Sequence, residues 1–552
     1  MKKERFTICV LAIGLAFCAG AQSLDKEIKV QRDIIPEHRS AERLPISPVI
    51  SLPAVNRSKL NYSMVDKPMG ITPAMQILPV NYPDVNNPEI YPGYAAIGYM
   101  PVYNAGVSAG YRLINTSKTR LGGWVQYNGR SYKPNRDTYI KRTVDTDNFS
   151  EHAVSVGVNL NQRTSAVSSL SADVDYSYYH YCMPSLVNAS QGVNNFNGSV
   201  AWRRDKEDGY LYGVSGGFSR FAFLNQNRGV DVNNITYLFR RPIRQNEMNF
   251  SADGGFAIND YSKGVIGIEF NYLHTPMTEK EYVNTKFDTW MLRLTPGYRY
   301  RSDYLSADVG LKVDVTSKAG AAVHVAPDIK VVYKPVSLLD VRFEAGGGEV
   351  QNTASSLFAD MPYMSQLFAF KNSHVPVTLD AGVTLGVIKG FYLDVFGGWA
   401  KANNWLLPVA GAEDGIGGVN VSAWHVGAEI GYHHGDMLDI KLKAETVSGS
   451  GDVKKSYYLW RDRAKYVIDG KVVYTPIKPL DFSLGYILRG KRKSGNTSLG
   501  SVNSLNFGAK YDINEKLAVF INGENLLNKH YFYIGDVPSQ GITGLAGVTL
   551  KF

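Results

Sequence analysis

The chain has 552 residues, a formal net charge of +9 and an aromatic content of 12%, with 35 tyrosines and 53 glycines. Its basic residues are scattered and form no single stripe, which argues against nucleic-acid binding. After the N-terminus no stretch of about 18 apolar residues occurs, so the sequence predicts no membrane-spanning helix. A tyrosine-rich, glycine-rich chain without long apolar runs is typical of a transmembrane β-barrel, whose aromatic residues lie at both membrane interfaces.

Residues 1–21 have the three parts of a secretory signal peptide: a basic head, an apolar core from Ile8 to Phe17, and a small-residue cleavage site at Ala19–Ala21. The alternative of a lipoprotein anchored at Cys18 is disfavoured by the bulky residue before it. After cleavage Cys182 would be the only cysteine, so no internal disulfide is expected.

Residues 22–92 differ in composition from everything that follows. They hold ten of the 24 prolines and one glycine, Gly70. Proline at this density disfavours regular sheet and helix interiors, so we expect an extended segment. Two alternatives stay open: a disordered periplasmic tail, or a strap that enters the lumen of a barrel.

From Gly93 onward the pattern is of strands about ten residues long, and the last one is the clearest. In GITGLAGVTLKF, Val548, Leu550 and the terminal Phe552 share an apolar face, while Thr549 and Lys551 lie on the other. A barrel strand with a terminal aromatic is what the outer-membrane barrel-assembly machinery receives, so we interpret Val548, Leu550 and Phe552 as the membrane-insertion signal.

Counting strands over 93–552 predicts twenty-two, an even number as bacterial single-chain barrels require. Alternate connections are tight turns, as at Thr116–Lys118 and His434–Asp436, and most of the others are long, as at 346–375 and 401–421. Short periplasmic turns and long outer loops are typical of outer-membrane barrels. The predicted fold class is therefore all-β: a large transmembrane antiparallel barrel of about 22 strands in the cell outer membrane.

Two stretches resemble the TonB-dependent receptors. The C-terminal FINGENLLNKHYFYIGDVPSQGITGLAGVTLKF is similar to the end of those receptors, and 110–130 resembles their early barrel hairpins in Bacteroidetes-type bacteria. The family motif N-L-[LF]-[ND]-K-x-Y is matched by Asn525, Leu526, Leu527, Asn528, Lys529 and Tyr531. The resemblance implies a 22-stranded barrel and transport across the outer membrane.

The sequence differs from these receptors in the segment that would fill the lumen of the barrel. Receptors of this family carry an N-terminal plug domain of more than a hundred residues, whereas only residues 22–92 precede the first predicted strand. Glu27-Ile28-Lys29-Val30 is only vaguely like the segment that such receptors offer to TonB. We therefore expect a plug-less relative, and interaction with TonB stays open.

The sequence contains no recognisable catalytic motif, so we expect no enzyme, no catalytic residues, no cofactor and no metal site. His180, His274, His374 and His530 fall near outer strand ends, outside any nucleophile motif. Apolar residues in two predicted outer loops are better candidates, either to bind a ligand or to fold inward over the barrel mouth. They include Phe358, Tyr363, Phe368 and Trp405.

The predicted location in the outer membrane indicates which molecules the protein would contact. Cations in the outer loops suit the phosphates of lipopolysaccharide, so lipid and lipopolysaccharide are expected neighbours. The predicted organisation is a signal peptide (1–21), a proline-rich periplasmic or lumenal segment (22–92) and a barrel (93–552). The favoured function is a channel or uptake component. The alternative is a scaffold that anchors a periplasmic or surface partner, such as a lipoprotein.

Overall fold

The computed structural model describes residues 91–101, 103–133, 148–183, 189–204, 210–224, 244–275, 287–317, 323–360, 371–388, 390–408, 416–451, 464–494, 497–531 and 539–552. The predicted signal peptide and all but the last two residues of the predicted proline-rich segment lie outside the described residues, as do Tyr363 and Phe368. Their boundaries and roles stay predictions.

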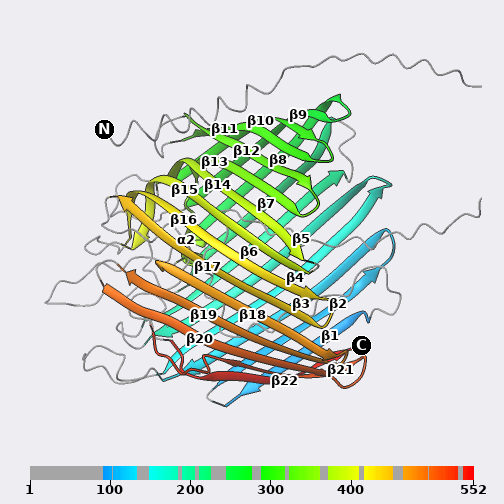
Figure 1. Cartoon of the computed structure of the whole chain (residues 1–552), viewed down its shortest axis with the longest axis vertical. Helices are drawn as coiled ribbons and strands as arrows, with labels where there is room; N and C mark the ends of the chain where they lie inside the picture. The colour runs from blue at the N-terminus through cyan, green and yellow to red at the C-terminus, as the bar shows by residue number, and fades with distance from the viewer. Residues whose placement is uncertain are drawn as a thin grey trace, which may run out of the picture. The chain divides into compact units, whose positions relative to one another are not determined.

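The described chain is built almost entirely of strands (Figure 1). They are β1 (Gly93–Met100), β2 (Asn104–Asn115), β3 (Thr119–Tyr132), β4 (Phe149–Ser165), β5 (Ser168–Met183), β6 (Ala189–Arg204), β7 (Leu211–Phe223), β8 (Arg244–Asn259), β9 (Ser262–Thr275), β10 (Phe287–Arg301), β11 (Leu305–Thr316), β12 (Val323–Val336), β13 (Leu339–Val350), β14 (Ser373–Ile388), β15 (Phe391–Pro408), β16 (Ile416–His434), β17 (Leu438–Gly451), β18 (Tyr466–Ile477), β19 (Leu480–Ser494), β20 (Thr497–Asp512), β21 (Leu517–Glu524) and β22 (Thr543–Lys551). A short helix, α2 (Ala354–Asp360), lies in the connection between β13 and β14.

The twenty-two strands form one antiparallel sheet that closes on itself, as predicted. Each strand pairs with its neighbours in sequence, and β1 closes the ring by pairing with β22 from Tyr94↔Lys551 to Tyr99↔Ala546. At the seam the backbones of Gly93 and Phe552 exchange two hydrogen bonds of 2.9 and 3.0 Å. Closure leaves no unpaired sheet edge, which is what allows a sheet to cross a lipid bilayer.

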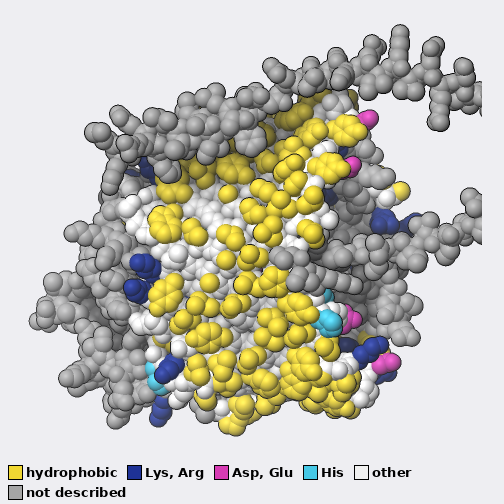
Figure 2. All heavy atoms as spheres, viewed as in Figure 1, with side chains coloured by type: hydrophobic (Ala, Val, Ile, Leu, Met, Phe, Trp, Pro, Cys, Tyr) yellow, Lys and Arg dark blue, Asp and Glu magenta, His cyan; other side chains and the backbone are white. Residues whose placement is uncertain are grey.

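The alternation along each strand separates an apolar outer face from a polar inner face. In β16, Trp424, Val426 and Ile430 are 36% exposed or more, while His425 and Glu429 are buried. Figure 2 shows apolar side chains gathered over the middle of the barrel wall, with charged side chains near its two ends. A closed barrel with an apolar outer belt is suited to lipid outside and polar groups inside, so the chain is an outer-membrane barrel. No helix in the described part of the chain is long and apolar enough to cross a membrane.

The two ends of the barrel differ in their connections. One end carries tight turns, as at 116–118, 166–167 and 435–437, and we assign it to the periplasm. The opposite, outer end has longer connections such as 133–148 and 351–372.

One predicted loop is wrong. The structure continues β15 to Pro408 and begins β16 at Ile416, so most of the predicted loop 401–421 is strand. The two strands stay paired there, from Trp405↔Val419 to Pro408↔Ile416.

Candidate functional site

The helix α2 lies against the inner wall of the barrel near its outer mouth. It arises between β13 and β14, yet its Phe358 ring packs against Phe221 and Phe223 of β7 and Tyr179 of β5, with centroids 5.6, 5.9 and 5.7 Å apart. These three aromatics belong to the inner face of the wall, since they lie in buried clusters together with α2. The described first part of this connection, residues 351–360, therefore folds inward against the inner wall.

Local chemistry explains how α2 starts and where it docks. Thr353 caps its N-terminus, because the Thr353 Oγ1 accepts the Ser356 N–H (3.1 Å) and the Ser356 Oγ in turn accepts the Thr353 N–H (3.1 Å). The N–H of Ala354, which has no partner within the helix, donates to Oε1 of Gln245 on β8 (2.6 Å). The helix is thus tied to the far wall by a hydrogen bond as well as by Phe358.

Beneath α2 the wall carries a buried ion pair. The Arg130 Nε of β3 donates to the Glu151 Oε2 of β4 (2.5 Å), and the Tyr179 hydroxyl donates to the other carboxylate oxygen (2.8 Å). Arg130 and Glu151 are each 2% exposed, and the guanidinium also lies over the Tyr132 ring at 5.8 Å. A pair this well satisfied fixes the wall on which α2 rests.

A second polar wall runs along β13 to β17. The Arg342 guanidinium donates to both oxygens of Asp394 at 2.7 and 2.6 Å. His425 lies between Asp380 (2.9 Å from Nε2) and Glu445 (3.1 Å from Nδ1), so both of its ring nitrogens have carboxylate partners. Inward-facing charges of both signs make this side of the lumen suited to water and hydrophilic solutes.

A third group gathers at the outer end of β10 to β14, near the two ends of the connection that carries α2. Arg293 and Asp314 form a bidentate pair at 2.7 and 3.1 Å. Beside them the side chains of His324, Glu349 and His374 converge from three consecutive strands. Of these three residues, the sequence indicated only His374, as a histidine near an outer strand end. No local pattern in the sequence marks His324 or Glu349.

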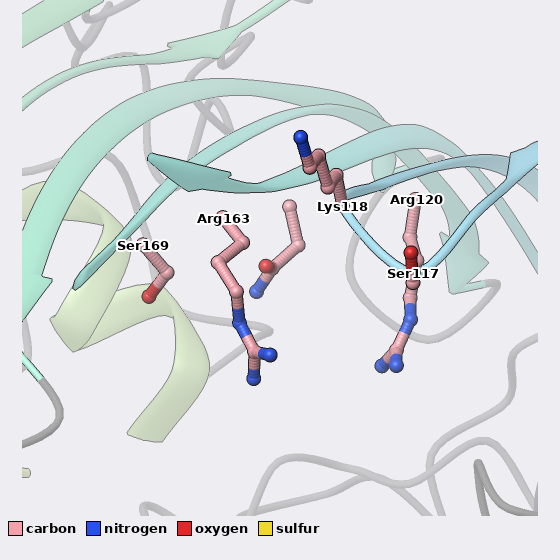
Figure 3. Close-up of a pocket in the computed structure, with 6 residues that line it drawn as sticks. Ser117, Lys118, Arg120, Arg163 and Ser169 are labelled. Atoms are coloured by element: carbon pink, nitrogen blue, oxygen red, sulfur yellow. The ribbon is translucent and has the colours of Figure 1, made fainter. Parts of the chain in front are cut away.

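At the periplasmic end a pocket of about 210 Å³ is lined by Ser117, Lys118, Arg120, Asn161, Arg163 and Ser169. Arg120 pairs with Asn161 across β3 and β4, and it shares a strand face with the inward-facing Arg130. Figure 3 shows the guanidinium ends of Arg120 and Arg163 extending to the same side, with Lys118 pointing away from them. The pocket therefore presents positive charge at the inner, periplasmic rim, a field that attracts anions.

The C-terminal motif has a structural role in the geometry. Asn525 is buried with a φ of 49°, and its Nδ2 donates to the carbonyls of Lys529 (2.8 Å) and Gln540 (3.0 Å). Asn528, also at φ 49°, accepts the Ile542 N–H (3.0 Å). Asparagine tolerates the left-handed conformation better than most residues. The motif thus ties the exit of β21 to the start of β22.

The remaining motif residues follow the end of β21, whereas the signal residues lie on the face of the last strand that the alternation predicts. Leu526 and Leu527 are exposed, and Tyr531 is buried with its N–H donating to the Ser539 Oγ (3.0 Å). Val548, Leu550 and Phe552 are at least 43% exposed on the outer face. Their role as an insertion signal stays a prediction.

The structure describes two of the predicted entrance residues, Phe358 and Trp405, and places them in different elements. Phe358 folds inward on α2, and a role in ligand binding stays a prediction. Trp405 is not on a loop: it lies in β15 after a register shift and packs on a cluster with Val375, Ala402 and Val421. It is only partly buried there, and because it lies in a paired strand its assignment to a loop is corrected.

Comparisons with known proteins agree at the level of fold. No protein-family model matches the chain, and no curated protein matches it either. Among solved structures, the siderophore receptor PirA of Acinetobacter baumannii matches with a TM-score of 0.63 at 10% identity, over 83% of this chain and 80% of that one.

Two further receptors match equally well. The ferric enterobactin receptor PfeA of Pseudomonas aeruginosa has a TM-score of 0.63 at 11% identity, over 83% of this chain and 81% of that one. The iron transporter FrpB of Neisseria meningitidis has a TM-score of 0.63 at 10% identity, over 84% and 81%.

The closed ring of strands, its apolar outer belt and its polar lumen define the chain as an outer-membrane β-barrel. More particularly, its barrel has the fold of the TonB-dependent receptors, as the resemblance in the sequence implied.

Proposed function

We propose that this protein is an uptake channel of the outer membrane, whose lumen is gated at the outer mouth by the connection that carries α2. The observation that carries the proposal is the docking of Phe358 and Ala354 against β5, β7 and β8. A short helix that is held to the wall by the Phe358 contacts and by the Ala354 hydrogen bond can dock and undock without disturbing the barrel.

The lining of the lumen supports a hydrophilic solute. The ion pairs of Arg342 with Asp394 and of His425 with Asp380 place charges of both signs on one wall. At the periplasmic rim Arg120 and Arg163 add positive charge to the pocket. We therefore propose that anionic solutes pass more readily than cationic ones, and that replacing both arginines with glutamine reduces this preference.

The comparisons support uptake as the general role, because the similar structures are named as receptors or transporters. Siderophore and iron are the substrates named for those proteins, and we assign neither to this chain. The plug-less organisation inferred from residues 22–92 belongs to the same proposal.

Conductance in planar lipid bilayers tests the function. The purified full chain is expected to form a narrow, ion-conducting pore, and deletion of residues 22–92 raises the conductance if that segment also obstructs the lumen. Folding is checked by heat-modifiable migration on a gel. A folded protein that conducts neither with nor without residues 22–92 would refute the channel and favour the scaffold that anchors a periplasmic or surface lipoprotein.

Energy coupling is tested separately in cells. Solute uptake that continues when TonB is removed supports a passive channel. Uptake that stops without TonB contradicts a passive channel and indicates the energised transport that the resemblance implies.

A further inference from the structure

Three donor atoms converge at the outer end of the lumen wall. They are Nε2 of His324 on β12, Oε2 of Glu349 on β13 and Nδ1 of His374 on β14, and all three lie within 4.8 Å of one another. Glu349 is 3% exposed, whereas the two histidine side chains are 14% and 21% exposed. The carboxylate is therefore enclosed, and the imidazoles leave a path to the lumen.

These three atoms have no hydrogen-bond partner in the described part of the chain, although each is buried. A buried polar atom without a partner costs about 1–3 kcal/mol, and here three such atoms point at the same space. His425 provides the contrast within the same barrel, since both of its ring nitrogens lie within hydrogen-bond distance of carboxylates. The arrangement of His324 and His374 therefore differs from that of His425, whose ring nitrogens both have carboxylate partners.

The spacing suits a metal ion. Glu349 Oε2 lies 3.6 Å from His324 Nε2 and 3.3 Å from His374 Nδ1. For ligands about 2.0–2.1 Å from a metal, these separations correspond to angles of roughly 105–125°, close to a tetrahedral arrangement. The centroids of the two imidazole rings lie 4.0 Å apart.

The backbone around Glu349 is arranged to hold its side chain in place. Its N–H donates to Asp314 Oδ2 (2.6 Å), its carbonyl accepts from Arg293 Nη2 (2.8 Å), and its carboxyl group makes a hydrogen bond with the Asn372 side chain. Outer groups of this kind orient ligands in metal sites.

A register shift brings Glu349 to the inner face. Inward residues of β13 are even-numbered up to Glu344, and the irregularity between Gly346 and Gly348 moves the inward position to the odd-numbered Glu349. Gly348 has a φ of 122°, which L-residues rarely adopt. An added Cβ there would lie 2.8 Å from Asp314 Oδ2. Glycine is therefore required for this geometry.

Charge favours a cation as well. The Arg293 guanidinium forms ion pairs with two carboxylates, Asp314 (2.7 Å) and Glu269 (3.6 Å), and it contacts Glu349 only through the backbone carbonyl, so the carboxylates of this group, with that of Glu349, outnumber the guanidinium. A divalent cation would offset this excess of negative charge.

We propose that His324, Glu349 and His374 bind a divalent transition-metal ion of the zinc type. Two imidazole nitrogens and one carboxylate oxygen are ligands that zinc prefers, whereas calcium and magnesium favour sites made of oxygen alone. Because Glu349 and His374 stand at the two ends of the connection that carries α2, the ion joins both ends to β12. The site requires only the folded barrel and does not depend on the proposed transport function.

Metal binding to the purified, tag-free barrel tests this proposal. After removal of metal with a chelator, titration calorimetry with Zn²⁺ is expected to show one equivalent bound, and an excess of Mg²⁺ is expected not to displace it. Co²⁺ in place of Zn²⁺ should give the visible absorption of a tetrahedral site. Glu349→Gln and His374→Gln should each weaken Zn²⁺ binding by more than about tenfold, and Asn372→Ala by about 10–100-fold.

His434→Gln is the matched control, because His434 is an exposed histidine in the last position of β16 at the periplasmic end. It should bind Zn²⁺ like the wild-type chain. Variants are compared only when their heat-modifiable migration shows a folded barrel. Failure of the folded wild-type protein to bind Zn²⁺, or equal binding by Glu349→Gln and the wild type, would overturn the proposal. In the first case the three side chains form a polar cluster that does not bind a metal ion.

Discussion

Replacing Phe358 with alanine is the most direct perturbation of the gate. The ring makes three aromatic contacts with the β5 and β7 wall, at centroid distances of 5.6–5.9 Å. Each such pair contributes about 0.5–1.5 kcal/mol, so the three together hold α2 by roughly 3 kcal/mol. Since 1.4 kcal/mol corresponds to a factor of ten in an equilibrium, Phe358→Ala should raise the undocked fraction of α2 by about 100-fold.

Single-channel recording in planar bilayers measures this shift as time spent in a higher-conductance state. Phe343→Ala is the matched control, because Phe343 is 40% exposed on the outer face of β13 and does not contact α2. The gate would be refuted if Phe358→Ala, folded by its heat-modifiable migration, conducted like the wild type and the control. In that case α2 rests on the wall without narrowing the lumen.

Three further outcomes follow from the same geometry. Glu151→Ala leaves the buried Arg130 without its carboxylate and should destabilise the barrel by about 3–5 kcal/mol, measured as a lower urea midpoint in detergent. Asn525→Ala removes the side-chain hydrogen bonds to the carbonyls of Lys529 and Gln540 and from the Lys529 N–H, and it should cost about 1–3 kcal/mol in the same titration; no change would contradict the structural role of the motif. Deleting Phe552 should slow assembly in cells, followed as the time course of the heat-modifiable form; an unchanged rate would exclude it from the insertion signal.

Much of the barrel could be predicted from the sequence because the information is local. A period of two places Val548 and Leu550 on one face and Thr549 on the other in any strand that lies between lipid and lumen. Tight turns such as 435–437 are also encoded locally, so the orientation of the barrel followed from connection lengths. The strand ends were less predictable, as Trp405 demonstrates, because pairing with β16 extends β15 beyond its alternating pattern.

Only the tertiary structure showed which side chains contact one another inside the lumen. Nothing near Phe358 in the sequence indicates that it contacts β5 and β7, since that contact depends on closure of the whole ring. The convergence of His324, Glu349 and His374 likewise requires three strands in register. It also requires the irregularity at Gly346–Gly348, which reverses the face that simple alternation assigns to Glu349. A local pattern determines which face of a strand meets lipid, but which inward side chains meet one another depends on register and closure, and these are properties of the folded barrel.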